Sequence, residues 1–193
     1  MFELHPLPFF LPKNAKVLFL GSFPPTKNRW SMDFYYPNLQ NDMWRIIGLV
    51  FFNDKNHFLL PSQKVFDKEK IIAFLEDKGI ALGDTAVKVH RAKNNSSDNF
   101  LEVVEAIDLE AVLLSIPHCY SIVTTGGKAT EVLASVLKIK EPSFNEPIFF
   151  DFLDRKMSWY RLPSTSRAYP KSLDEKARLY KKMLEEVLVK EGR

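Results

Sequence analysis

Short apolar runs alternate with amphipathic segments along the chain. The runs at 16–20 and 120–125 are nearly continuous, which predicts strands buried on both faces. The stretch 80–89 is expected to begin as a second strand or an extended run beside the first. Residues 148–152 and 158–162 flank a polar turn and predict a hairpin or two neighbouring strands. We therefore expect a central sheet of about four strands.

Helical patterns lie between these runs, over 44–52, 67–78, 108–116, 128–137 and 172–190. Asp67 is a typical N-cap and Gly79 a typical C-terminal stop, while Ser172 and Glu175 have the spacing of a capping box. Because strands alternate with helices, we expect one domain over 1–193. It should be a three-layer α/β/α sandwich around a mostly parallel sheet.

Two segments are expected to lie outside these elements. The opening segment contains Pro6, Pro8 and Pro12, so an extended arm is expected there rather than a helix or a central strand. The polar stretch 90–99 contains no core-forming residues and predicts a surface loop. The chain shows no internal repeat and no low-complexity segment.

Composition is that of an ordinary soluble globular protein, with 46% apolar and 26% charged residues in a chain of 193. A single cysteine, Cys119, excludes an internal disulfide framework and any multi-cysteine metal site. The four histidines show no ligand spacing, so surface or cap roles are expected, without a metal or cofactor. No run is long enough for a membrane span, and the start lacks a leader pattern, so a cytoplasmic location is expected.

Charge is distributed unevenly along the chain. Residues 155–193 hold eleven lysines and arginines against five acidic residues, whereas 1–154 hold sixteen against nineteen. A basic C-terminal part is compatible with an anionic polymer as a partner. A solvated face of the last helix explains the same pattern, so charge alone does not decide.

The loop after the first predicted strand has an unusual composition. It should lie at the carboxyl edge of the sheet, where open α/β proteins bind ligands. It contains aromatic, proline and amide residues: Tyr35, Tyr36, Pro24, Pro25, Asn38, Gln40 and Asn41. Such a set can stack on a flat ring and hydrogen-bond its edge. A purely structural connection remains the alternative.

A second loop, 162–170, is dense in hydroxyl groups and follows another predicted strand. Its hydroxyls and backbone N–H groups, with Arg167 and Lys171, suit phosphate oxygens. The alternative is a simple cap for the last helix. If the sheet is parallel, this loop and the first can meet at one edge.

Together the two loops resemble a known family. The order of GSFPP at 21–25, YYPNLQNDMW at 35–44 and LPSTSRAYP at 162–170 is similar to that in the uracil-DNA glycosylase superfamily. The similarity is greatest to its hypoxanthine-DNA glycosylase branch, smaller to the mismatch-specific uracil/thymine branch, and spans about residues 16–183. It implies a monomeric enzyme that acts on double-stranded DNA with a damaged or mismatched base. Such an enzyme flips a deaminated base, hypoxanthine or uracil, out of the duplex and hydrolyses its N-glycosidic bond.

The resemblance also implies roles for individual residues. Asn41 matches the catalytic amide, which can orient water or hold the departing base but cannot act as a strong base. Tyr36 matches the aromatic on which the flipped base stacks. The expected base pocket is formed by Gly21, Ser22, Phe23, Pro24, Tyr36 and Thr125. The expected DNA contacts are Ser164, Thr165, Ser166, Arg167, Tyr169 and Lys171, with Arg167, Ala168 or Tyr169 filling the gap in the duplex.

Three positions depart from related proteins. Phe23 stands where other branches carry a water-activating Asn or Asp, a change that is shared with the hypoxanthine branch. Pro25 replaces a usual glycine, and Thr125 stands where relatives carry an amide. These changes motivate an alternative: a relative that binds nucleic acid without excising a base. A third possibility, a small-molecule hydrolase or nucleotide-binding enzyme, lacks a nucleophile elbow and a Walker-type loop.

Overall fold

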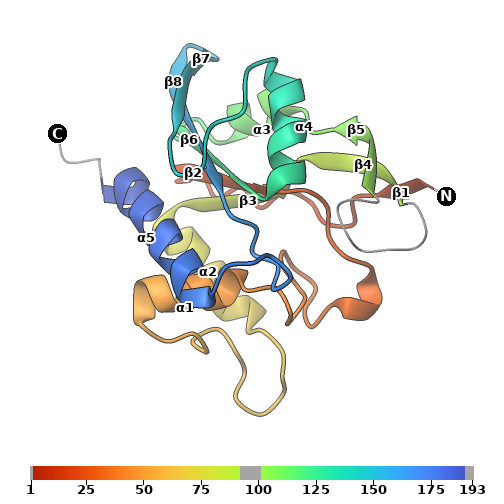
Figure 1. The fold of residues 1–193 in the computed structure, drawn as a ribbon, viewed down its shortest axis with the longest axis vertical. Helices are drawn as coiled ribbons and strands as arrows, with labels where there is room; N and C mark the ends of the chain where they lie inside the picture. Colours follow the sequence, from red (N-terminus) through yellow and green to blue (C-terminus); the bar gives the residue numbers. More distant parts are fainter. Residues whose placement is uncertain (1, 92–100, 190–193) are drawn as a thin grey trace.

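A five-stranded sheet forms the centre of the protein (Figure 1). The structure is a computed structural model and describes residues 2–91 and 101–189. Its strand order is β3-β2-β6-β8-β7. The first four strands are parallel, and β7 pairs antiparallel with β8 at one edge. The strands span Ile80–Asp84 (β3), Val17–Gly21 (β2), Ser121–Thr125 (β6), Arg155–Leu162 (β8) and Ile148–Phe152 (β7).

The predicted mostly parallel α/β architecture is confirmed, but the expected count of about four strands is corrected to five. The sequence predicted a hairpin or two neighbouring strands over 148–162, and a hairpin contributes both β7 and β8 to this sheet. Leu153 and Asp154 form the turn with positive φ angles. The turn is tight enough for β8 to begin at Arg155, within the segment expected to be polar turn.

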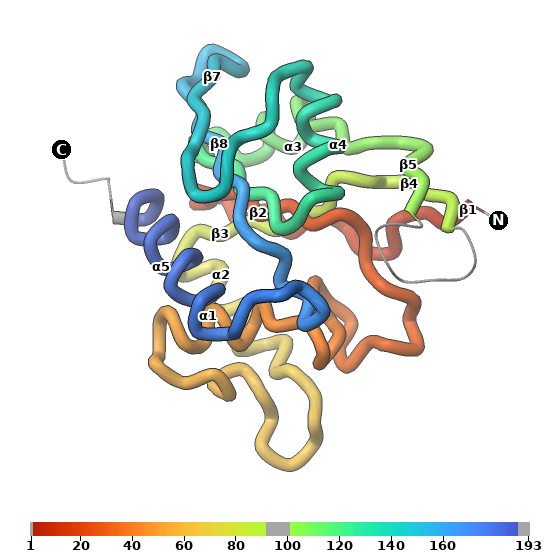
Figure 2. Tube along the Cα trace, in the orientation of Figure 1, coloured from red at the N-terminus to blue at the C-terminus, as the bar shows by residue number. Residues whose placement is uncertain are grey.

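Helices cover both faces of the sheet (Figures 1 and 2). Side chains of β2 alternate between the faces, so Phe19 packs in one core cluster and Leu18 in the other. On the Phe19 side lie α1 (Met43–Phe52), α2 (Lys68–Lys78) and α5 (Leu173–Val189). On the opposite side lie α3 (Leu109–Ser115) and α4 (Gly127–Leu137). Both faces are buried, which explains the uninterrupted apolar runs.

The helix ends follow the predicted caps. The Asp67 carboxylate accepts a hydrogen bond from the backbone N–H of Lys70 at 3.1 Å, and Gly79 ends α2 with a left-handed φ of 67°. Ser172 and Glu175 form the expected capping box: the backbone N–H of each donates to the side chain of the other. The last helix therefore starts where the sequence predicts, immediately after the second loop.

A second, antiparallel sheet was not predicted. It has the order β1-β4-β5 and is formed by Phe2–Leu4 (β1), Ala86–Arg91 (β4) and Leu101–Ala106 (β5). The strand or extended run expected to begin at Ile80 beside the first strand is confirmed for Ile80–Asp84, which pairs with β2. The chain then leaves the central sheet at Thr85, so the run is two strands of different sheets. There the backbone N–H of Thr85 donates to the Gly21 carbonyl at 2.8 Å, and β4 then pairs with β1 and β5.

The expected loop over 90–99 is also corrected at its start, because His90 and Arg91 pair with β5 in an antiparallel ladder. Residues 92–99 of that prediction lie outside the described residues. Strand β4 is held by backbone hydrogen bonds to β1 and β5, so side chains on its solvent-facing side can be polar. The polar residues at the start of 90–99 were therefore misinterpreted as a loop.

The proline-rich N-terminal arm is extended, as expected. The backbone N–H of His5 donates to Val87 in β4, and Phe10 exchanges two backbone hydrogen bonds with Leu82 in β3. The arm thus runs from the small sheet to the edge of the central one.

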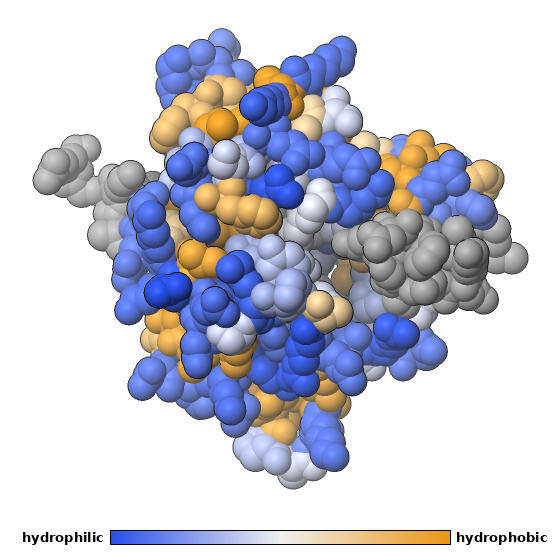
Figure 3. Space-filling model, in the orientation of Figure 1, coloured by the Kyte–Doolittle hydropathy of each residue, from blue (hydrophilic) through white to orange (hydrophobic). Residues whose placement is uncertain are grey.

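On the face shown in Figure 3 most residues are hydrophilic. In the described part of the chain, no helix is long and apolar enough to cross a membrane.

Candidate active site

A cleft of about 540 Å³ opens at the carboxyl ends of the parallel strands. Both loops singled out in the sequence line it, as expected for loops that follow parallel strands. Its walls include nearly all of the predicted site residues: Gly21, Ser22, Phe23, Pro24, Tyr36, Asn41, Thr125, Ser164, Thr165, Ser166, Ala168 and Tyr169. Pro25, Arg29 and Asp84 line it as well. Arg167 and Lys171 do not.

Tyr36 forms one wall of the cleft in a constrained conformation. Its φ of 51° lies in the left-handed region, which is uncommon for a residue other than glycine. Its hydroxyl lies 3.1 Å from Oγ1 of Thr125, and its ring packs edge-on against Trp44 at 6.1 Å. Burial and the charge of Asp84 raise the pKa of Tyr36, so the phenol is neutral. The neighbouring Tyr35 packs in the core at 3% exposure and also lines the cleft.

Asn41 lies at the start of α1. Its Oδ1 accepts a hydrogen bond from the backbone N–H of Met43 at 2.9 Å, a cap-like contact although the N-cap residue itself is Asp42. No hydrogen bond from the Asn41 amide nitrogen to a described residue is present. The cap explanation and a functional one are therefore compatible, because the oxygen is used in the fold and the nitrogen is available to a ligand.

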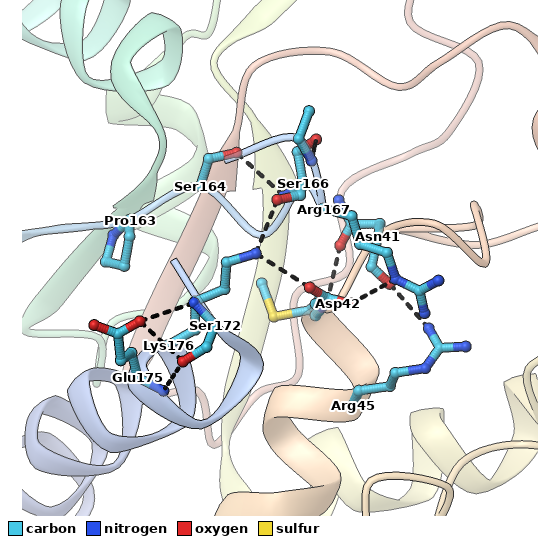
Figure 4. A network of polar contacts seen from close by, with 12 residues as sticks. Asn41, Asp42, Arg45, Pro163, Ser164, Ser166, Arg167, Ser172, Glu175 and Lys176 are labelled. Atoms are coloured by element: carbon cyan, nitrogen blue, oxygen red, sulfur yellow. Dashed lines mark hydrogen bonds and ion pairs between the residues drawn. The ribbon is translucent and has the colours of Figure 1, made fainter. Parts of the chain in front are cut away.

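A buried ion pair that sequence reasoning missed joins the first loop to α5, and both of its residues also contact the second loop. Lys176 on α5 is 0% exposed, and its Nζ lies 3.1 Å from Oδ2 of Asp42. The same ammonium donates to the Ser166 carbonyl at 2.8 Å. Asp42 Oδ1 accepts from Nε of Arg167 at 3.0 Å, and the Asp42 backbone N–H donates to the Thr165 carbonyl (Figure 4). Asp42 thus fixes the second loop against the first.

Hydrogen bonds within the second loop, residues 162–170 and below called the hydroxyl loop, order its backbone. Oγ of Ser164 accepts from the backbone N–H of Ser166 at 3.2 Å (Figure 4). Oγ of Ser166 accepts from the backbone N–H of Ala168 at 3.3 Å. In both contacts the serine oxygen is the acceptor, which leaves each O–H to donate elsewhere. Thr165 is buried at 3% exposure. Among these three residues, Ser164 and Ser166 are therefore the better placed to donate to an anion.

Positive side chains lie beside this loop. Arg45 donates to the carbonyls of Leu39 and Asn41, and burial together with the charge of Arg167 lowers the pKa of Arg45. Arg167 is nearly half exposed although it is held by Asp42. Arg45 and Arg167 are close enough for their charges to interact, and two guanidinium groups beside the second loop favour the binding of an anion.

Asp84 and His5 form a second buried pair, at the floor of the cleft. Nε2 of His5 lies 2.8 Å from Oδ2 of Asp84, with side chains 9% and 8% exposed. The expectation of a surface or cap role for this histidine is wrong. Its sequence neighbours are the prolines of the arm, and only the path of that arm across β3 brings it to Asp84, 79 positions away. No local pattern carries such a signal.

The arm also secures the base of the first loop. Arg91, 7% exposed, donates to both carboxylate oxygens of Glu3 and to the carbonyl of Pro24. Its guanidinium lies 5.7 Å from the centre of the Phe23 ring, which also meets His5 edge-on at 5.2 Å. Phe23 therefore presents an apolar surface, and neighbouring residues fix the backbone of Pro24 from outside the cleft.

Two other kinds of chemistry find no support in the described residues. No group of three or more His, Cys, Asp or Glu side chains in 2–91 and 101–189 is arranged to hold a metal ion. Cys119 is buried away from the cleft, and burial raises the pKa of its thiol to about 12, so it is not a thiolate nucleophile at neutral pH. The chemistry of the cleft rests on amide, hydroxyl, phenol and carboxylate groups.

Comparison with known proteins gives one informative result. No protein-family model matches the chain, and no curated protein matches it. Among solved structures, the chain is similar to a protein from Methanosarcina acetivorans described as a "putative Uracil DNA glycosylase". The TM-score is 0.64 at 23% sequence identity, and the match covers 96% of this chain and 99% of that one. The chain therefore shares the fold of that protein over nearly its whole length.

Proposed function

We propose that the protein is a DNA glycosylase that flips a deaminated base, hypoxanthine or uracil, into the cleft and hydrolyses its N-glycosidic bond. The observation that carries this proposal is the meeting of Tyr36, Asn41 and the Ser164–Ser166 segment in one cleft. An aromatic wall, a free amide N–H and paired hydroxyls are the groups that a flipped nucleotide needs. The fold shared with the Methanosarcina protein and the motif order agree with this assignment.

The proposed reaction follows from the chemistry of these groups. The flipped base stacks on Tyr36, and the Asn41 amide orients water or hydrogen-bonds the departing base. Ser164 and Ser166 donate to phosphates on either side of the flipped nucleotide, with Thr165, Arg167, Tyr169 and Lys171 as further DNA contacts. Arg167, Ala168 or Tyr169 fills the gap in the duplex. No metal or cofactor is proposed, and the enzyme is proposed to act as a cytoplasmic monomer.

The choice of base rests on Phe23 and Asn41, which both match the hypoxanthine branch. A phenyl ring cannot activate water, so the attacking water must be positioned by another group. Gly21, Ser22, Phe23, Pro24 and Thr125 are proposed to surround the base through backbone groups and apolar surface. Hypoxanthine is therefore the proposed substrate ahead of uracil.

One observation favours a second candidate, a protein that binds damaged DNA without cutting it. The Thr125 hydroxyl, which stands where relatives carry an amide, is engaged by Tyr36 and lies 3.5 Å from the Leu20 carbonyl. Pro25 in the cleft also lacks a backbone N–H. Salt-dependent binding of lesion-containing duplexes without any abasic product would support this candidate.

A strand-cleavage assay separates the two candidates. Duplexes carrying hypoxanthine, uracil or a thymine mismatch are incubated with the protein, and alkali breaks any abasic site. We expect cleavage at hypoxanthine or uracil by the parent protein and by Asn56→Ala, an exposed amide outside the cleft. Asn41→Ala should lose it. Cleavage by Asn41→Ala at the parental rate would contradict the proposed role of Asn41.

A further inference from the structure

Only one of the two carboxylate oxygens of Asp84 takes part in a hydrogen bond with a described residue. Oδ2 is held by His5, while Oδ1 has no hydrogen-bond partner among the described residues. Asp84 is only 6% exposed and lines the cleft. Oδ1 is not among the fully buried atoms that lack a partner in the described residues, which are Asn145 Oδ1 and Arg161 Nε. It is therefore open to the cleft, where the N–H of a ligand can donate to it.

His5 fixes the direction of this free oxygen. Its Nδ1 lies 2.8 Å from the Leu7 carbonyl, and its ring is stacked on Tyr35 at 6.0 Å between centroids. Phe23 closes the other side. Burial alone would lower the pKa of His5, but the hydrogen bond and charge of Asp84 and the Leu7 carbonyl raise it overall. The imidazole is held on three sides, so it presents Nε2–H to Oδ2 alone.

The free oxygen lies in the same corner of the cleft as Tyr36. A Cβ atom added at Gly21 would collide with Oδ1 of Asp84 and would lie 3.4 Å from the Tyr36 hydroxyl. Only a glycine lets the carboxylate approach the β2 backbone this closely. A base stacked on Tyr36 would therefore have one edge beside Oδ1.

A carboxylate oxygen at this place can only accept a hydrogen bond. Deamination turns adenine into hypoxanthine and cytosine into uracil, and in each case a ring nitrogen with a lone pair becomes a ring N–H. A carboxylate repels the lone pair and accepts from the N–H. Such a contact discriminates strongly, because the wrong ring leaves the buried carboxylate unpaired.

We propose that Asp84, positioned by His5 of the N-terminal arm, selects hypoxanthine over adenine and uracil over cytosine by accepting a hydrogen bond from the ring N–H through Oδ1. This inference rests on the proposed function and deepens it. His5 is a positioning residue that does not touch the base. The arm that carries it is thereby part of the site.

The test compares bases that differ in this N–H and in the carbonyl oxygen beside it, and the Asp84 variant then separates the two differences. Duplexes carry a 2′-fluoroarabino nucleotide, which resists cleavage, with hypoxanthine or with unsubstituted purine as the base. A second pair carries uracil or 2-pyrimidinone. We expect the parent protein to bind each N–H base about tenfold or more tightly than its lone-pair partner, as befits a hydrogen bond to a charged group. Equal binding within each pair would overturn the inference.

Variants then assign the discrimination to the pair. In Asp84→Leu, which keeps a similar shape, the two bases of each pair should bind within about twofold of one another. His5→Ala should lower the preference, and His5→Gln, which can still donate to Asp84, should restore most of it. Equal losses for both bases in His5→Ala and His5→Gln would mean a purely structural role and would overturn the positioning claim.

The outcome for the proposed function is read separately. If any lesion duplex binds better than undamaged duplex but the preference for N–H bases is absent, only the present inference fails. If no lesion duplex binds better than undamaged duplex, the proposed function fails and this inference fails with it.

Discussion

The Nζ atom of Lys176 lies 3.1 Å from Oδ2 of Asp42, and neither side chain is exposed beyond 8%. The two residues are 134 positions apart and connect α5 to the start of α1. Because Lys176 also donates to the Ser166 carbonyl, the pair fixes the hydroxyl loop against the Asn41 loop. The proposed phosphate contacts and the proposed catalytic amide are thus held in one rigid arrangement.

Breaking this pair should destabilise the protein and loosen the second loop. Lys176→Met leaves the buried Asp42 carboxylate with Arg167 as its remaining ionic partner, which we expect to lower the free energy of unfolding by about 3–5 kcal/mol. Urea denaturation measures the loss. Lys182→Met, at an exposed position on the same helix, should change stability by less than about 0.5 kcal/mol. An equal free energy of unfolding for Lys176→Met and the parent would show that the ion pair does not stabilise the fold.

Tyr36 should contribute to binding through its ring and not through its hydroxyl. Tyr36→Ala removes the stacking surface, which is worth about 1–3 kcal/mol per base, so binding of a non-cleavable lesion duplex should fall about tenfold or more. Tyr36→Phe loses only the contact to Thr125 and should stay within about threefold of the parent. Fluorescence anisotropy measures both. A large loss in Tyr36→Phe with little further loss in Tyr36→Ala would argue against stacking.

Duplex binding should weaken steeply with salt, because phosphate contacts release condensed counterions. Lys171→Ala is expected to weaken binding to all duplexes alike and to reduce the slope of log K against log salt by about 1. Lys55→Ala, on the exposed loop after α1, is the matched control and should keep the parental slope. A lesion-dependent effect of Lys171→Ala would contradict a phosphate contact.

Stability should depend on pH through His5. Its pKa is raised above the ordinary value of 6.5, so the protonated pair with Asp84 stabilises the fold fully below about pH 6.5. This contribution is lost as the pH rises through the raised pKa. Asp84 and Tyr35 are the ionisable groups in contact with the ring, and burial followed by the charge of Asp84 raises the pKa of Tyr35, so it stays neutral.

Thermal unfolding between pH 5 and 9 measures this dependence, over a window chosen to span the ordinary histidine pKa. His5→Gln cannot be protonated, so its stability should vary less with pH than that of the parent. His118→Gln, at an exposed position, serves as the control. An identical pH profile for the parent and His5→Gln would exclude a contribution from the protonated pair.

The sequence predicts much of the central fold because its signals are local. Apolar runs in β2 and β6, the Asp67 cap and the Ser172–Glu175 box each act within a few residues. The small sheet escaped prediction because the chain changes sheets at Thr85, with only this residue between the end of β3 and the start of β4. Its partners, β1 and β5, also have few buried residues.

The residues of the candidate site likewise fall into those that the local sequence predicts and those that it does not. The loop residues that line the cleft could be identified from the composition and order of two loops. The pairs His5–Asp84 and Asp42–Lys176 could not, because each joins residues that only the tertiary fold brings together. A buried lysine in an amphipathic helix looks like any surface lysine until its partner is known.

Release of a free base from lesion-containing DNA measures the proposed glycosylase activity directly. A duplex with hypoxanthine, and one with uracil, is incubated with excess protein, and the released base is quantified by chromatography. We expect release from at least one of the two duplexes by the parent and by Asn56→Ala, and a rate about a hundredfold lower for Asn41→Ala. Absence of free base from both duplexes, with folded protein that binds the lesion, would contradict the proposed glycosylase activity.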